Sequence, residues 1–233
     1  MSDMVQTRRG FLKGALAGGA LAGAALPPLV QAHSLPPAPA APPAYVFFTP
    51  LEATFIEALV NHMVPADAAC PGGVDLGINV YIDRALAGEW GSGDRLYLQG
   101  PWKPGAPTQG YQLALTPAQL YRAGIAATER HAVATHGAGF AALAAAQKEL
   151  VLQGLDSGAV VLDNALPAKT FFAILYQTVV EGMFADPIYG GNADKAAWKM
   201  IGFPGVIGTN AQNLKLFKNK RFQGPTFSIA DVS

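Results

Sequence analysis

The sequence has a single cysteine, Cys70, among 233 residues. Covalent haem attachment requires a Cys-x-x-Cys-His motif, and an iron–sulfur cluster requires several cysteine ligands. One cysteine therefore excludes both kinds of redox centre from this chain, together with an internal disulfide bond. Two interpretations of Cys70 stay open: a buried free thiol, or a disulfide bond to another chain.

Motifs for nucleotide binding and for serine hydrolases are also missing. The chain has no Walker loop, no Gly-x-Gly-x-x-Gly after a strand and no Gly-x-Ser-x-Gly elbow. The glycines of residues 14–19 follow no predicted strand, so they do not indicate a nucleotide loop. We therefore expect no catalytic residue and no cofactor in this chain.

Charge is scarce and balanced. Charged residues make up 14% of the chain, against about 25% in typical soluble proteins. The whole chain has 16 basic and 16 acidic residues, and residues 33–233 have 13 and 15. No basic patch emerges from these totals, so a nucleic-acid partner is not expected. With 51% hydrophobic residues, the low charge predicts a surface that another protein covers.

The N-terminal residues resemble a twin-arginine export signal. Residues 7–13 read Thr-Arg-Arg-Gly-Phe-Leu-Lys, and residues 14–26 form a run rich in Gly, Ala and Leu. This run is shorter than the about 20 strongly apolar residues of a membrane span. The twin-arginine translocase carries folded proteins, usually because a cofactor is inserted before export. The residues that carry the signal are Arg8, Arg9, Phe11, Leu12 and Lys13.

Small residues at positions 30 and 32 predict signal cleavage between Ala32 and His33. An uncleaved, weakly apolar membrane anchor is the alternative. After Ala32 no apolar run approaches the length of a membrane span. We therefore expect residues 33–233 to lie in the periplasm, with membrane contact only through partners.

The rest of the chain is predicted to fold as one all-α domain of five or six helices. Thr49-Pro50-Leu51-Glu52 and Thr116-Pro117-Ala118-Gln119 are typical helix starts with a capping box. Apolar residues then follow at helical spacing, and no alternating hairpin pattern is present. The predicted helices cover about 50–64, 78–87, 117–136, a stretch after 140, about 168–183, and a short helix around 198.

Four parts follow from this pattern: the signal (1–32), a Pro-rich linker or arm (33–47), the helical domain (48–208) and an extended C-terminal tail (209–233). The Pro-rich part is either a spacer or an arm along a neighbouring subunit. Long connections rich in Gly, Pro and aromatic residues interrupt the helices, above all 89–111 and 186–205. Connections of this length are usually functional or docked on another surface.

Candidate metal and acid–base residues are few. The best metal candidate is a set on one predicted helix: Glu129, His131 and His136. Their spacing scatters them around the axis, whereas helical metal pairs favour i, i+4, so surface or capping roles are favoured. His62 is predicted to be a hydrogen-bonded structural residue. Three carboxylates match turns and caps as well as acid–base chemistry: Asp67, Asp75 and Asp83.

Three segments of the chain carry a likeness to a known family. The first combines Val64-Pro65-Ala66-Asp67, Pro71-Gly72-Gly73-Val74 and Tyr81-Ile82-Asp83. The second is residues 184–192, Phe-Ala-Asp-Pro-Ile-Tyr-Gly-Gly-Asn, and the third is residues 198–205, Trp-Lys-Met-Ile-Gly-Phe-Pro-Gly. Together they resemble the gluconate 2-dehydrogenase subunit 3 family over roughly residues 48–205.

The resemblance implies a non-catalytic small subunit of a membrane-bound dehydrogenase for sugars, polyols or sugar acids, such as gluconate, fructose or sorbitol. In such complexes a large subunit holds FAD and often an iron–sulfur cluster. A multihaem cytochrome c subunit passes the electrons to quinone. The small subunit is implied to carry the large one through the twin-arginine translocase to the periplasmic face of the bacterial inner membrane. The family offers no catalytic residues to transfer.

A pair that survives export predicts a large apolar interface between the two subunits. The irregular segments hold the aromatic types that usually anchor interfaces. The predicted interface residues are Trp90, Trp102, Tyr189, Trp198 and Phe203. For each of them, packing in the chain's own core is the alternative. The second functional hypothesis is an independent periplasmic metal-binding protein or enzyme with a pocket near residues 129–136.

Overall fold

The computed structural model describes residues 44–233, apart from residues 95, 104, 107–108, 164–165, 207 and 209–210. The predicted export signal, its cleavage site between Ala32 and His33, and most of the Pro-rich segment lie outside the described residues. None of the described helices is both long and apolar enough to span a lipid bilayer.

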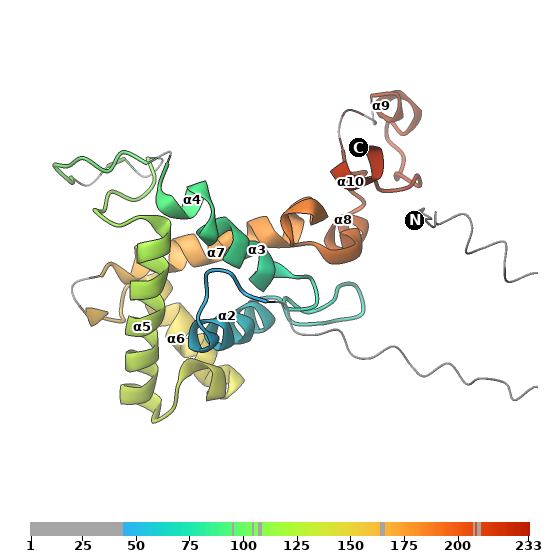
Figure 1. The fold of residues 1–233 in the computed structure, drawn as a ribbon. Helices are drawn as coiled ribbons and strands as arrows, with labels where there is room; N and C mark the ends of the chain where they lie inside the picture. The colour runs from blue at the N-terminus through green and yellow to red at the C-terminus, as the bar shows by residue number, and fades with distance from the viewer. Residues whose placement is uncertain are drawn as a thin grey trace, which may run out of the picture. The chain divides into compact units, whose positions relative to one another are not determined.

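The described chain is helical, which confirms the all-α prediction (Figure 1). Its α-helices are α2 (Pro50–Met63), α3 (Ile78–Ala87), α4 (Glu89–Ser92), α5 (Pro117–His136), α6 (Ala145–Ser157), α7 (Ala168–Phe184), α8 (Ala196–Ile201), α9 (Asn213–Leu216) and α10 (Ile229–Val232). Short 3₁₀ helices are η1 (Phe140–Ala142), η3 (Pro187–Tyr189) and η4 (Ala193–Lys195). Within the described residues, β pairing is limited to one isolated bridge between Gly205 and Phe227.

The predicted helices correspond to α2, α3, α5, α6, α7 and the short α8. Three one-turn helices, α4, α9 and α10, were not predicted. Both predicted capping boxes are present. The Thr49 side chain accepts from the Glu52 backbone N–H, and Thr116 does the same for Gln119, so local chemistry sets where α2 and α5 begin.

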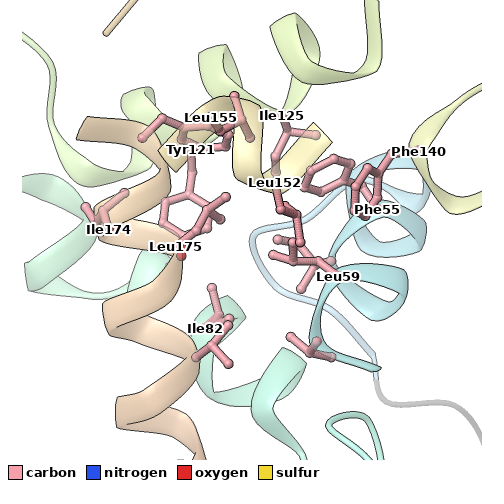
Figure 2. Close-up of a cluster of buried hydrophobic side chains, with 14 of the residues drawn as sticks. Phe55, Leu59, Ile82, Tyr121, Ile125, Phe140, Leu152, Leu155, Ile174 and Leu175 are labelled. Carbon is pink, nitrogen blue, oxygen red and sulfur yellow. The ribbon is translucent and has the colours of Figure 1, made fainter. Parts of the chain in front are cut away.

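The core lies where the five longest helices meet. Figure 2 shows side chains from α2, α3, α5, α6 and α7 converging on one cluster. Phe55 of α2 packs against Phe140 with their ring centroids 4.8 Å apart, and both side chains are fully buried. Tyr121 of α5 is also fully buried, and its hydroxyl is hydrogen-bonded to Thr178 of α7. Truncating a buried phenylalanine of this kind to alanine typically costs about 3–5 kcal/mol.

A buried carboxylate joins the start of the domain to α3. The Asp83 oxygens accept hydrogen bonds from the backbone N–H groups of Val46, Phe47 and Phe48 at 2.7, 2.9 and 2.9 Å. Phe47 is also covered by the Arg122 guanidinium, 4.2 Å from its ring centre. Asp83 therefore has a structural role: it lies within α3 and holds the backbone that precedes α2.

The segment predicted as an extended tail folds back onto the domain. It contains α9 and α10, and the backbone N–H of Ile229 donates to Asp186 at 2.8 Å. Lys195 donates to Asp231 at 2.7 Å, and this hydrogen bond, together with those from the Ser228 backbone and side chain, lowers the pKa of Asp231 to about 2. Non-local bonds of this kind have no periodic signal in the sequence, which explains why the prediction showed only an irregular tail.

Candidate partner-binding surface

Residues 186–192, here called the 186–192 platform, form a tight turn after α7. Asp186 caps η3, because its side chain accepts from the Ile188 N–H at 3.1 Å. Gly190 then takes the left-handed conformation, with φ of 104°, and ends the 3₁₀ turn. The sequence Asp-Pro-Ile-Tyr-Gly-Gly-Asn thus encodes a cap, a helix start and a reversal within seven residues.

Close backbone contacts hold the platform against α3 and α7. A Cβ atom at position 191 would lie 2.1 Å from the carbonyl oxygen of Gly182, which is far inside contact distance. A Cβ atom at position 77, where α3 begins, would lie 2.4 Å from the carbonyl oxygen of Gly190. Only glycine allows the backbones to approach this closely at these two places.

Asn192 fixes the C-terminal end of the platform through buried hydrogen bonds. Its side chain is completely buried, donates to the Ala185 carbonyl at 2.9 Å and accepts from the Ala197 N–H at 3.0 Å. These two bonds join the end of α7 to the start of α8. The result is a fixed frame on which Ile188 is exposed and Tyr189 is 57% exposed.

A hollow of about 660 Å³ opens beside the platform. It is lined by Tyr81, Arg84, Ala85, Val180, Glu181, Phe184, Ala185, Asp186 and Tyr189. Burial, followed by the charge of Glu181, raises the pKa of Tyr81 to about 12, so its hydroxyl stays protonated and donates to Glu181 at 3.4 Å. Arg84 forms no ion pair among the described residues. The hollow therefore offers a free guanidinium beside tyrosine rings, which suits a carboxylate or an aromatic side chain of a partner.

A second hollow, of about 620 Å³, lies between α7 and the connection from α4 to α5. Trp90 is 38% exposed at its edge, and Tyr97 stands well exposed beside it. Tyr111 donates to the Leu115 carbonyl at 3.1 Å, and burial raises its pKa to about 12. Figure 1 shows this connection as a long loop beyond the ends of α4 and α5.

The structure distributes the predicted interface residues unequally. Trp90 and Tyr189 are exposed, whereas Trp102 and Phe203 are half-buried. Trp198 is only 6% exposed: its indole N–H donates to the Phe184 carbonyl at 2.8 Å, and its ring packs edge-on against Phe203 at 5.2 Å. Trp198 therefore packs within the chain and is not an exposed anchor. That the exposed residues contact a partner stays a prediction.

Cys70 is buried and unpaired within the chain. Its backbone N–H donates to Asp67 at 2.8 Å, in a turn that Asp67 caps. Burial, with a smaller contribution from the Asp67 charge, raises the pKa of the Cys70 thiol. A disulfide bond to another chain would require this residue to become exposed, and it stays a prediction.

Of the three residues weighed as metal ligands, Glu129 has a structural role, and His131 and His136 lie half-buried towards the end of α5. Glu129 accepts from the Phe140 N–H at 3.1 Å and so caps the turn at η1. His62 is hydrogen-bonded to Glu149 at 3.0 Å, which confirms the predicted role of this histidine and lowers the pKa of Glu149. The described residues contain no group of three or more His, Cys, Asp or Glu side chains that could hold a metal ion.

Sequence reasoning missed Tyr81 and Arg84 as surface residues. They lie three positions apart on a helix that was predicted correctly, so their shared face could have been inferred. The position of the 186–192 platform next to this face could not have been inferred, because the contact joins residues about 100 positions apart.

Comparison with protein families gives one match. The family model described as gluconate 2-dehydrogenase subunit 3 matches residues 50–205, from the start of α2 to the end of the segment after α8. No curated protein and no solved structure matches the chain. The match covers two thirds of the chain and includes the 186–192 platform. The chain therefore belongs to the gluconate 2-dehydrogenase subunit 3 family, whose members are subunits of a dehydrogenase complex.

Proposed function

We propose that this chain is the non-catalytic small subunit of a periplasm-facing, membrane-bound flavoprotein dehydrogenase. In this proposal it escorts the folded, FAD-containing large subunit through twin-arginine export and stabilises it afterwards. The family match over residues 50–205 carries the proposal. The sequence adds support, because residues 7–13 resemble a signal for export of folded proteins, while the chain has no recognisable cofactor motif of its own.

The redox groups are assigned to other chains. FAD, and often an iron–sulfur cluster, belong to the large subunit, and haem c belongs to a multihaem cytochrome subunit. The single cysteine supports this division, since covalent haem and iron–sulfur clusters both need more cysteines than Cys70. The twin-arginine translocase is the third proposed partner, and the periplasmic face of the inner membrane is the proposed location.

The 186–192 platform is the proposed anchor for the large subunit. Its exposed Tyr189 stands beside the hollow that holds Arg84, and tyrosine and arginine are the types that most often dominate binding energy. The frame beneath Tyr189 is held by the buried Asn192 and by close glycine contacts. Little conformational entropy is therefore lost when a partner binds there.

The escort role is tested by replacing both signal arginines with lysine in cells that make all the subunits. The Arg8→Lys/Arg9→Lys chain should leave the large subunit in the cytoplasm and abolish dehydrogenase activity at the periplasmic face. Lys13→Arg is the matched control, because it also exchanges one cation for another but keeps the twin arginines. Normal periplasmic activity with the double variant would remove the escort role.

A further inference from the structure

The C-terminal part of the chain is strongly biased towards positive charge. Between Asp194 and Asp231 there is no acidic residue, although this stretch holds six of the 16 basic residues. The rest of residues 33–233 has seven basic and 15 acidic residues, so the two parts carry opposite charge. Positive and negative charges cancel in the whole-chain total, so the net charge alone indicated no basic patch.

Four of these cations lie in one loop, residues 211–224, here called the basic loop. The chain leaves the domain at Gly205 and returns at Phe227, where the backbones pair: Val206 donates to Phe227 at 2.9 Å, and Phe227 donates to Pro204 at 3.2 Å. Figure 1 shows α9, which belongs to the basic loop, beyond α8 and α10. The loop is thus closed at its base and presents its tip to the outside.

The tip combines cations with exposed aliphatic side chains. Leu214 is 77% exposed and Leu216 is 65% exposed. The four cations are also exposed and form no ion pair within the described part of the chain: Lys215, Lys218, Lys220 and Arg221. Phe217 and Phe222 pack against each other with their ring centroids 5.1 Å apart, which holds the two sides of the loop together.

The four cations alone could bind any partner that carries phosphate groups. The exposed leucines beside them are stabilised only where they can enter an apolar environment. Both needs are met at the surface of an anionic bilayer, where apolar side chains enter the boundary between headgroups and acyl chains while lysines contact phosphates. We propose that the basic loop binds directly to membranes that contain anionic phospholipids, through its four cations and the leucines of α9.

This proposal differs from the expectation that membrane contact occurs only through partners. It does not rest on the escort role, because the basic loop lies outside residues 50–205, which match the family. It assigns a second attachment point to the chain: the 186–192 platform faces a protein, and the basic loop faces lipid.

The test uses the full chain with Arg8→Gln, Arg9→Gln and Lys13→Gln as the common background, so that the signal cations do not contribute. Binding is measured by co-sedimentation with vesicles of phosphatidylglycerol and phosphatidylcholine, and with vesicles of phosphatidylcholine alone. The background protein should bind the anionic vesicles at least about tenfold more tightly than the neutral ones. Raising the ionic strength from about 0.1 M to about 1 M shortens the Debye length from about 10 Å to about 3 Å and should release most of it.

Replacing the four loop cations by glutamine should weaken binding to anionic vesicles by about tenfold or more. The matched control replaces three lysines and one arginine elsewhere in the domain, of which only Lys148 is half-buried: Lys103, Lys148, Lys169 and Arg130. It has the same net charge as the loop variant and should stay within about twofold of the background. Leu214→Ser/Leu216→Ser should bind several-fold more weakly while keeping the preference for anionic vesicles.

Two results would overturn the proposal. An equal loss of affinity for anionic vesicles in the loop variant and in the matched control would mean that net charge alone governs binding. Unchanged vesicle binding by the loop variant, with loss of the large subunit from the purified complex, would make the basic loop a protein interface. Because the substituted side chains of the basic loop are exposed, circular dichroism and the melting temperature should be the same for the loop variants and the background protein.

Discussion

Two surfaces of this molecule place exposed aromatic residues beside a hollow of similar size, about 660 Å³ at the 186–192 platform and about 620 Å³ at the connection from α4 to α5. The platform rests on the buried Asn192, on two hydrogen bonds to Asp186 and on glycine contacts to α3 and α7. Within the described part of the connection, most hydrogen bonds join neighbours, such as Ala106 to Gln109.

The comparison indicates different roles in binding. A surface whose backbone is held by contacts with distant residues loses little conformational entropy on association, whereas a connection held mainly by local hydrogen bonds is expected to lose more. We therefore expect the platform to provide most of the affinity for the large subunit. The connection from α4 to α5 should add contact area with little net binding energy.

The largest effect is expected from Gly191→Ala. The new Cβ atom would lie 2.1 Å from the backbone oxygen of Gly182, so α7 and the platform must separate. Overpacking of this kind should lower the free energy of unfolding by about 3 kcal/mol, measured by urea denaturation. Gly208→Ala is the control, since nothing lies within 4 Å of its Cβ position, and it should change stability by less than about 0.5 kcal/mol. Equal stability of both variants would mean that the platform is not rigidly held.

Asn192→Ala comes next. It removes the bonds to the Ala185 carbonyl and to the Ala197 N–H and leaves these backbone groups without their partner. The expected loss is about 2 kcal/mol of unfolding free energy, from the same urea experiment. If the unfolding free energy fell only as little as it does when an exposed polar residue is replaced, the buried hydrogen-bonding role of Asn192 would be contradicted.

The two surfaces are compared directly by Tyr189→Ala and Trp90→Ala. Tyr189→Ala should weaken binding of the large subunit by about 1.5 kcal/mol, roughly tenfold in Kd, and leave stability unchanged. Trp90→Ala should weaken it by less than about 0.5 kcal/mol, because the connection beside Trp90 is held mainly by local hydrogen bonds. The two Kd values can be measured by surface plasmon resonance. The reverse order would assign the main anchor to the connection from α4 to α5.

The smallest effect concerns alkaline pH. Tyr81 and Tyr111 both have a folded-state pKa of about 12, above the ordinary value of 10.0. Their contribution to stability is complete below pH 10 and is lost as the pH rises towards 12, because the unfolded chain releases these protons first.

The causes of the two pKa shifts differ, so one substitution separates them. Glu181 contributes to the raised pKa of Tyr81, whereas Tyr111 depends on burial alone. Glu181→Gln should therefore lower the pKa of Tyr81 and leave that of Tyr111 unchanged. The titration can be followed by tyrosinate absorbance, with Tyr81→Phe and Tyr111→Phe to assign each signal. An unchanged tyrosinate titration in Glu181→Gln would contradict the placement of Glu181 beside Tyr81.

Local chemistry made the helical part of the fold predictable. Thr49 and Thr116 mark the starts of α2 and α5 because a capping box involves only four consecutive residues. The contacts that fix the start of the domain and the candidate site join distant residues. Asp83 binds the backbone of residues 46–48, and Asp186 binds Ile229, and neither pairing has a periodic signal.

Burial of single aromatic residues was equally hard to predict. Trp198 and Tyr189 lie in the same irregular stretch and were both predicted as anchors, yet Trp198 is buried and Tyr189 is exposed. The difference arises from the Phe184 carbonyl, which accepts the indole N–H and draws the Trp198 ring inward. The basic loop was missed for another reason: opposite charges in the two parts of the chain cancel in the total.

The central claim is that this chain works bound to a flavoprotein. The most direct measurement is purification from the native membranes through a tag placed after Ser233, followed by flavin fluorescence and haem absorbance of the eluate. The account predicts that an FAD-containing large subunit elutes with this chain, together with a haem c signal. A colourless chain that elutes alone, from membranes that hold active dehydrogenase, would contradict it.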